Sequence, residues 1–465
     1  MTNIPKTDTI CALSTPPGMG AIAVIRLSGP GSFEITGKVF SPADKKLDIK
    51  TARSHTIHLG IIGTDTSILD EVLISIFRAP HSYTGEDVIE ISCHGSVYIQ
   101  QKTLELLLTH GARLAKPGEF TLRAFMNRKF DLSQAEAVAD LIASHSGSSH
   151  DLAVQQMRGG FSKKISSLRQ SLVEFTALIE LELDFSEEHM IFADRADLNS
   201  LLEKIEIELR ILVQSFSLGN VIKKGIPVAI IGKPNVGKST LLNAILNEEK
   251  AIVSEIPGTT RDAIEDTIVI GGYSFRFIDT AGLRAAEDKI ETIGIERTWE
   301  KIGDAAIILY VFDATAQSFA DVMESLSEFK EITADKTHRL ILIGNKMDKI
   351  KSLPKGFKDF VEHETIFVSG KRKENIHLIA EHLQQVIEET KISDKTIVSN
   401  SRHYEALQKA LDSILSVRTG LLEGISPDLL TIDIRKALYH LGEITGEITT
   451  DEILGAIFSR FCVGK

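Results

Sequence analysis

Eight residues halfway along the chain, Gly232 to Ser239, constrain its fold more than any other segment. They read Gly-Lys-Pro-Asn-Val-Gly-Lys-Ser, follow the apolar run Val228 to Ile231 and precede the helix-like stretch Thr240 to Leu246. A glycine-rich turn between a buried strand and a helix lets backbone N–H groups curl around a phosphate, and the helix adds the positive end of its dipole. The spacing therefore predicts a phosphate-binding loop on an α/β sheet.

Two side chains at the end of this loop suit a nucleoside triphosphate with magnesium. Lys238 would bridge β- and γ-phosphate oxygens, and the Ser239 hydroxyl would take one position on an octahedral magnesium ion. Gly232 and Gly237 leave space for the phosphate chain. The strand before, the helix after and the complete spacing make a chance glycine-rich turn a poor alternative.

The size and composition of the chain are those of a globular protein with several domains. Its 465 residues give room for about three domains, and its hydrophobic content of 43% is ordinary. Met1 to Thr9 lack the apolar region of a signal peptide, and no apolar run approaches the ~20 residues that span a bilayer. The three cysteines, Cys11, Cys93 and Cys462, are far apart and lack metal-ligand spacing. We expect a protein of the reducing cytoplasm.

The net charge limits how the chain could meet a nucleic acid. At -12, it argues against a uniformly basic binding surface, because phosphate contacts need clustered lysine and arginine. A nucleic acid partner would therefore require a local basic patch or a helper protein.

Residues 1–119 are predicted to form an α+β domain. The candidate strands are Thr9–Ala12, Ala21–Leu27, Val72–Arg78 and Val88–Ser92, and a helix is expected over Val97–Thr109. Turn-forming clusters such as Pro16-Pro17-Gly18 separate these runs.

Residues 120–221 and 389–465 are predicted to be helical. Apolar residues recur at helical spacing and indicate core packing in a bundle; they are Ile165, Leu168, Leu172, Phe175 and Ile179, then Leu202, Ile205, Leu209, Leu212 and Phe216, and after the middle domain Tyr404, Leu407, Leu411 and Ile414. Gly219 is expected to end the second of these helices. Thr449 and Glu452 have the spacing of a capping box for a last helix.

Residues 222–388 return to apolar runs that alternate with helical segments, which predicts a mostly parallel α/β sheet. The runs are Val228–Ile231, Phe275–Ile278, Ala306–Phe312, Leu340–Gly344 and Ile366–Val368. The simplest architecture inserts this domain into one helical domain built from both flanks. Two separate helical regions on either side remain an alternative.

A second motif selects the base of the nucleotide. Asn345-Lys346-Met347-Asp348 follows the run that ends at Gly344. The Asp348 carboxylate can accept two hydrogen bonds from the N–H edge of guanine, whereas adenine would leave this charge unpaired. Lys346 would lie along the base, and Ser369-Gly370-Lys371 would give a backbone donor to the guanine carbonyl. Alone, such a motif is most often a surface turn, but after a phosphate-binding loop it predicts guanine specificity.

Two further loops have the composition of nucleotide-dependent switches. Asp279-Thr280-Ala281-Gly282 follows a candidate strand, so Asp279 would hold magnesium through water and Gly282 would meet the γ-phosphate. In Gly258-Thr259-Thr260-Arg261-Asp262, Thr260 would complete the magnesium shell only with a triphosphate. Leu283 stands where Ras-like enzymes place a water-orienting glutamine. These elements together resemble the translation-factor-like branch of the Ras-type GTPases.

More distant motifs make the resemblance specific. They are Thr15-Pro16-Pro17-Gly18, Val24 to Gly29, Ser82 to Asp87, Lys116 to Thr121 and the terminal Phe461-Cys462-Val463-Gly464-Lys465. With the GTPase motifs they closely resemble the MnmE (TrmE) family of tRNA-modification GTPases, in the same domain order over essentially the whole chain.

This resemblance implies a multidomain α/β and α fold, with an N-terminal α+β folate-binding domain, a helical bundle and an inserted Ras-like P-loop GTPase domain. It implies a homodimer through the N-terminal domains, paired GTPase domains, and a heterotetramer with the flavoprotein MnmG, which would carry the FAD. Together they would add an aminomethyl or carboxymethylaminomethyl group to carbon five of the wobble uridine of certain tRNAs, using a formyl- or methylene-tetrahydrofolate unit.

The resemblance also assigns the residues of the GTPase site. Potassium would be held by Asn235, Ser254, Ile256 and Thr259, and magnesium by Ser239 and Thr260. Glu291 would orient the attacking water in place of the glutamine that is missing at Leu283. Lys238 and Asp279 complete the catalytic set. The GTP-binding residues it implies are Asn235, Val236, Gly237, Lys238, Ser239, Thr240, Ser254, Glu255, Ile256, Pro257, Gly258, Thr259, Thr260, Asp279, Thr280, Ala281, Gly282, Asn345, Lys346, Asp348, Ser369, Gly370 and Lys371.

For folate, the resemblance assigns Arg26, Glu90, Lys129 and Lys465. A carboxylate suits the amino-pyrimidine edge of a pterin and cations suit the glutamate tail. Without the resemblance, Arg26 and Lys129 would be routine surface charges. Cys462 would face the same pocket near the one-carbon unit, or it is a small buried hydrophobe near a chain end.

Two other function classes are open on the sequence. A ribosome-assembly GTPase of the same branch would need neither Arg26 and Glu90 nor the terminal motif. A folate-dependent one-carbon enzyme merely regulated by GTP is the other class, but no separate catalytic constellation supports it.

Overall fold

The computed structural model describes residues 8–64, 67–184, 195–249, 266–278, 305–327, 338–350, 352, 357, 364–389, 396–459 and 461–464. The chain forms two compact units. One comprises Met1–Ile142, Val154–Leu209 and Ala406–Lys465, and the other comprises Ala143–Ala153 and Arg210–Glu405. None of the helices within the described ranges is long and apolar enough to cross a membrane.

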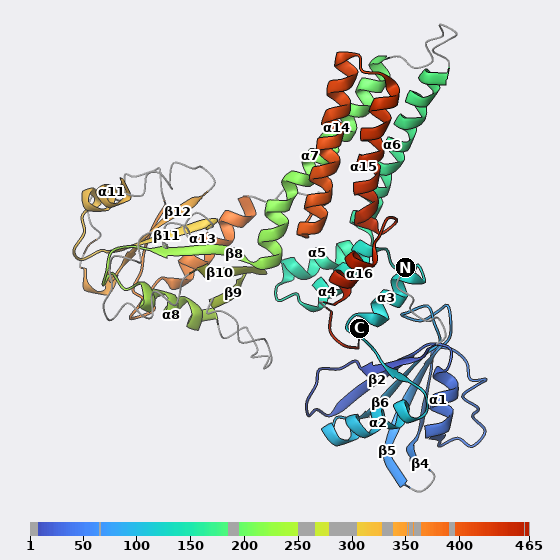
Figure 1. Cartoon of the computed structure of the whole chain (residues 1–465). Helices are drawn as coiled ribbons and strands as arrows, with labels where there is room; N and C mark the ends of the chain where they lie inside the picture. Colours follow the sequence, from blue (N-terminus) through green and yellow to red (C-terminus); the bar gives the residue numbers. More distant parts are fainter. Residues whose placement is uncertain are drawn as a thin grey trace. The chain divides into compact units, whose positions relative to one another are not determined.

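The N-terminal part of the chain is built on a seven-stranded sheet in the order β3-β4-β5-β6-β2-β1-β7 (Figure 1). Neighbouring strands are antiparallel except β1 and β7. The strands are β1 (Ile10–Leu13), β2 (Ile22–Ser28), β3 (Phe40–Pro42), β4 (Thr56–Thr64), β5 (Ser67–Phe77), β6 (Val88–His94) and β7 (Arg113–Leu114). Helices α1 (Ser32–Val39) and α2 (Val97–Thr109) pack on one face, where Ile25, Leu27 and Ile91 are fully buried.

The four strands expected here are present with shifted ends, and the helix over Val97–Thr109 is confirmed. Strand β4 was not predicted, although Thr56 to Leu59 alternate between polar and apolar residues. It places Ile57, Leu59 and Ile61 on an exposed face, while Gly60 lies on the buried face. The alternation is present, but its apolar residues lie on the exposed face, so the pattern does not show which face packs against the core.

Helices from both sides of the α/β segment form one bundle (Figure 1). Helix α6 packs against α15, and Arg418 of α14 forms an ion pair with Glu206 of α7. The helices of the chain's helical regions are α3 (Glu119–Met126), α4 (Leu132–Ile142), α5 (Gly147–Met157), α6 (Gly160–Asp184), α7 (Arg195–Lys224), α14 (Ser401–Glu423), α15 (Pro427–Thr445) and α16 (Asp451–Phe458). The inserted arrangement is therefore confirmed, and the alternative of two separate helical regions is wrong.

The prediction that Gly219 ends a helix is wrong. Helix α7 continues through it to Lys224. A Cβ at position 219 would overlap the Val398 carbonyl oxygen, and the Val398 amide donates a hydrogen bond of 3.1 Å to Ser215 Oγ on the same helix. The glycine therefore allows another backbone segment to lie directly on α7.

The predicted capping box at Thr449 is also wrong by one residue. Thr450 is the N-cap of α16, and its side chain accepts a hydrogen bond of 3.2 Å from the Ile453 amide. Glu452 is then the second helical residue rather than the third, so it cannot reach back to the cap as a capping box requires.

The second sheet has six strands in the order β13-β12-β11-β8-β10-β9, and only the β9–β10 pair is antiparallel. The elements are β8 (Ile226–Ile231), α8 (Lys238–Glu249), β9 (Asp266–Ile270), β10 (Tyr273–Ile278), β11 (Ile307–Asp313), α11 (Phe319–Ser327), β12 (Arg339–Asn345), the 3₁₀ turn η2 (Met347–Lys349), β13 (Glu364–Phe367) and α13 (Ile376–Glu389). Helices α8 and α13 cover one face and α11 the other. The predicted mostly parallel α/β sheet is confirmed.

Candidate functional site

The loop from Gly232 to Gly237 joins β8 to α8, as its spacing predicts, and Lys238 is the first residue of α8. Asn235 and Gly237 have backbone φ angles of 63° and 95°. A Cβ at Gly237 would overlap Asn345 Nδ2. The loop therefore needs glycine at this position both for its conformation and for the approach of the second motif.

The Lys238 ammonium is held by the loop that it follows. Its Nζ donates hydrogen bonds of 2.8 Å to the Gly232 carbonyl and 2.9 Å to the Lys233 carbonyl. Burial lowers its pKa. A phosphate chain would have to replace these carbonyls as the acceptor, and a partly desolvated cation favours that exchange.

Asn345 is the centre of the site. It is 3% exposed at the carboxyl end of β12 and connects three loops. Its Nδ2 donates 2.9 Å to the Val236 carbonyl, while its Oδ1 accepts from the Lys346 amide at 2.8 Å and the Gly370 amide at 3.0 Å. The phosphate loop and both predicted base loops are therefore assembled on one side chain, at the edge where parallel strands end.

Lys346 connects the base motif to the phosphate loop. Its Nζ donates to the Asn235 carbonyl at 2.8 Å and forms a 2.6 Å ion pair with Asp313. Burial would raise the pKa of Asp313, but the hydrogen bonds from Lys346 and Thr315, with the charge of Lys346, together lower the pKa. Asp313 was not predicted as part of this site. The signal that could have identified Asp313 is its position at the carboxyl end of β11, where parallel sheets bind their ligands.

Asp348 is prepared as a hydrogen-bond acceptor. The Ser369 hydroxyl donates 2.7 Å to Asp348 Oδ1 and lowers the pKa of this carboxyl. Arg372 Nε lies 3.9 Å from Asp348 Oδ2. The carboxylate is thus ionised and oriented by Ser369, as the recognition of guanine requires.

Several predicted residues lie outside the described ranges and stay predictions. They are Ser254, Glu255, Ile256, Pro257, Gly258, Thr259, Thr260, Asp279, Thr280, Ala281, Gly282 and Glu291 of the GTPase site, with Leu283, and Lys465 of the folate site.

A second constellation lies on the N-terminal sheet, on the face opposite α1 and α2. Arg26 on β2 and Glu90 on β6 are direct cross-strand partners. Arg26 donates 2.9 Å from Nε, and its Nη2 is 2.7 Å from the same Glu90 oxygen. The Arg26 guanidinium lies 5.2 Å from the ring centre of Tyr83 and 5.7 Å from that of Phe120. An ion pair flanked by aromatic rings can recognise a planar polar ring.

The terminal motif lies against this N-terminal sheet. Gly464 accepts a 3.2 Å hydrogen bond from Ser14 Oγ, and the Cys462 carbonyl accepts one of 3.3 Å from the Gly118 amide. Cys462 is free and exposed, unlike the buried Cys11 and Cys93. The interpretation of Cys462 as a buried hydrophobe is therefore wrong, while its place beside a one-carbon unit stays a prediction. Lys129 is exposed, with Nζ 3.1 Å from the Pro80 carbonyl.

Known proteins resemble the chain over nearly its whole length. The family described as the MnmE helical domain matches residues 132–462, and the GTP-binding protein TrmE N-terminus matches residues 9–129. A tRNA modification GTPase MnmE of Flavobacterium psychrophilum is 52% identical over 460 residues, with 98% of this chain and 99% of the relative covered. Proteins of that name from Cytophaga hutchinsonii (99% and 98% covered) and Bacteroides fragilis (98% and 99%) are each 51% identical. The chain therefore belongs to the MnmE (TrmE) family.

Proposed function

We propose that this chain is a GTP hydrolase that acts in tRNA modification. The observation that carries the proposal is the assembly around Asn345, which joins the phosphate loop to the base loops. An oriented Asp348 and the cation of Lys238 suit the two ends of GTP. The names of relatives about 50% identical, which are tRNA modification GTPases, supply the substrate class.

Magnesium and potassium fit the residues of this site. Ser239 lies in the first turn of α8 and Asn235 on the exposed rim of the phosphate loop. Hydroxyl, amide and carbonyl oxygens are ligands that hard cations prefer. Ser239 and Thr260 would hold magnesium, and Asn235, Ser254, Ile256 and Thr259 would hold potassium. Such cations neutralise negative charge on the phosphates, while Glu291 would orient the water.

Hydrolysis should depend on the monovalent cation. We expect GTP hydrolysis to be at least about tenfold faster in potassium than in sodium at equal ionic strength, because one well-placed charge is worth that much in a transition state. Asn235→Ala should remove the difference. Glu291→Ala should slow hydrolysis about 100-fold in both salts with GTP affinity nearly unchanged, since it acts on the water alone.

The matched control is Asn243→Ala, which changes an exposed asparagine on α8 and should keep the potassium effect. Equal wild-type rates in the two salts would refute the role of Asn235. A Glu291→Ala variant that lost GTP affinity would remove Glu291 from water positioning.

A reduced folate fits the N-terminal constellation. The Arg26–Glu90 pair is partly exposed, at 18% and 26% of the side chains, and the rings of Tyr83 and Phe120 flank it. A carboxylate can meet the amino-pyrimidine edge of a pterin, and Lys129 and Lys465 would meet the glutamate tail. Bound tetrahydrofolate, in its formyl or methylene form, would supply the one-carbon unit that is added to the uridine.

A calorimetric titration of the whole chain with 5-formyltetrahydrofolate tests this site. We expect saturable binding, and Arg26→Gln should raise the dissociation constant at least about tenfold, because a charged partner of a polar ring is lost. Arg53→Gln, at an exposed position on the same domain, should bind like the wild type. No binding by the wild type would overturn the folate proposal.

We also propose the assembly expected for this family: a homodimer through the N-terminal domains, paired GTPase domains, and a heterotetramer with the flavoprotein MnmG. The exposed face of β4 and β5 supports the dimer. Leu59 and Leu73 are cross-strand neighbours and are 47% and 45% exposed, beside Ile57 at 65%. A contiguous apolar surface of this kind favours a protein contact. Sedimentation equilibrium of the whole chain distinguishes a dimer from a monomer.

A further inference from the structure

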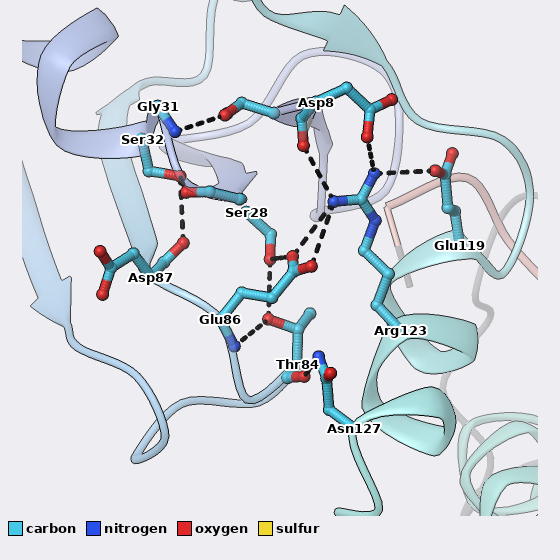
Figure 2. Close-up of polar contacts among 12 residues, drawn as sticks. Asp8, Ser28, Gly31, Ser32, Thr84, Glu86, Asp87, Glu119, Arg123 and Asn127 are labelled. Carbon is cyan, nitrogen blue, oxygen red and sulfur yellow. Dashed lines mark hydrogen bonds and ion pairs between the residues drawn. The ribbon is translucent and has the colours of Figure 1, made fainter. Parts of the chain in front are cut away.

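An ion cluster with a buried centre lies next to the Arg26 site, and none of its residues has a role in the proposed GTPase or folate function. Its centre is Arg123 on α3, whose side chain is 3% exposed (Figure 2). Arg123 Nη2 donates 2.8 Å to Asp8 Oδ1 and 3.1 Å to Glu119 Oε1, and Nη1 lies 3.2 Å from Glu86 Oε2. Arg113 pairs with Asp8 and Glu119 from the other side. Three carboxylates therefore share two guanidinium groups.

The desolvation of the ions in this cluster offsets much of the stability that their attraction contributes. The two buried ions of the cluster, Arg123 and Glu119, are 3% and 4% exposed, and removing such an ion from water costs several kcal/mol before its attraction to its partners is counted. Among the described residues, Arg123 Nε is buried without a hydrogen-bond partner, which adds the cost of an unsatisfied donor. Stability alone is thus a weak explanation, and a cluster of fixed geometry is better suited to hold something in place.

Glu86 belongs to the loop from Ser82 to Asp87 and anchors this loop to its surroundings. Glu86 Oε2 accepts 2.7 Å from Ser28 Oγ on β2, and Ser28 Oγ is 2.7 Å from Thr84 Oγ1. The Glu86 amide donates 3.2 Å to that same Thr84 oxygen, and Asn127 Nδ2 donates 2.7 Å to the Thr84 carbonyl. Figure 2 shows these bonds converging from β2, the loop and the end of α3. Ser28 and Thr84 are fully buried, so the loop has one well-defined anchor.

The anchored loop forms a wall of the Arg26 site. Its Tyr83 ring lies over the Arg26 guanidinium, and the Tyr83 hydroxyl is 2.8 Å from Thr121 Oγ1 on α3. Arg26 and Ser28 are two residues apart on β2 and so lie on the same face of the sheet. Ser28, which bonds to Glu86, is two residues from Arg26 on β2. The cluster therefore holds the loop next to the Arg26–Glu90 pair that would meet the pterin.

We propose that Arg123 and Glu86 are positioning residues, which fix the loop so that Tyr83 closes the Arg26–Glu90 site around a planar ring such as a pterin. The proposal rests on the folate function above. Neither side chain is assigned a contact with the ligand. A loop free to move would have to be ordered when the ligand binds, and pre-ordering removes that cost.

The test compares two variants, each of which neutralises one carboxylate partner of Arg123. Glu86→Gln keeps an acceptor for Ser28 but loses the ionic anchor, whereas Asp8→Asn leaves the loop contacts intact. Titrated with 5-formyltetrahydrofolate, the Glu86→Gln chain should bind at least about tenfold more weakly, because small displacements of a positioning group have effects of that size. Asp8→Asn should bind within about twofold of the wild type, and both should hydrolyse GTP normally.

The melting temperatures of the same two variants separate positioning from general stability. In either variant Arg123 keeps two of its three carboxylate partners, so the two melting temperatures should fall by similar amounts. Folate affinity should fall in Glu86→Gln alone, because only that variant loses the anchor of the loop. If both variants lose folate affinity in step with their melting temperatures, or if Glu86→Gln binds as tightly as the wild type, the proposal is overturned. A wild type that binds no folate overturns the folate function, and this proposal with it.

Discussion

Replacing Asp348 by asparagine should weaken GTP binding by at least about 100-fold. The carboxylate offers two acceptors to the two N–H donors of guanine, whereas the carboxamide offers one acceptor and leaves one of these donors unpaired. The variant should instead gain affinity for xanthosine triphosphate, whose base presents a carbonyl where guanine presents an amino group. The carboxamide of asparagine can donate to that carbonyl. Competition binding with labelled GTP and with xanthosine triphosphate measures both changes.

The control for this variant is Glu324→Gln, an exposed residue on α11 of the same domain, which should leave both affinities unchanged. An Asp348→Asn chain that kept wild-type GTP affinity would show that Asp348 does not read the base. Loss of both nucleotides together would instead indicate damage to the Ser369 and Gly370 loop, because Ser369 donates to Asp348.

Gly219→Ala should destabilise the chain by about 2–3 kcal/mol, although alanine is normally the better residue inside a helix. The added methyl group would overlap the Val398 carbonyl oxygen, and Val398 is fully buried. The backbone near Val398 must then move off α7 and lose its bond to Ser215. Chemical denaturation of the two proteins measures the difference in the free energy of unfolding.

Gly455→Ala is the matched control, because Gly455 lies inside α16 and, apart from its chain neighbours and the backbone of its own helix, no atom lies within 4 Å of the position of a Cβ. There the substitution should be neutral or stabilise the chain by up to about 1 kcal/mol. Equal effects at the two glycines would contradict the close approach of Val398 to α7.

Local patterns predicted the GTPase segment well because the chemistry of its loops is local. The loop from Gly232 to Gly237 and the motif that ends at Asp348 were predicted from spacing alone, and the structure places both at the carboxyl ends of parallel strands. Asp313 was missed. Its role depends on Lys346, which follows another strand, β12, and no short window of sequence contains both residues.

The N-terminal site was harder to predict for the same reason. Arg26 and Glu90 are 64 residues apart and became a pair only through the register of β2 with β6. Taken alone, Arg26 looked like a routine surface charge. Arg123 gave no signal at all, since a single arginine in a short amphipathic helix is usually exposed.

By itself, the sequence determined which chemical groups this protein carries and where strands and helices alternate, because hydrogen bonding and turn geometry depend on neighbouring residues. It also determined the family. Only the tertiary structure decided that Asn345 joins three loops, that Gly219 lies inside a helix and that Arg123 is buried among carboxylates. Those outcomes depend on which buried faces meet across the chain, and such contacts are set by packing rather than by spacing.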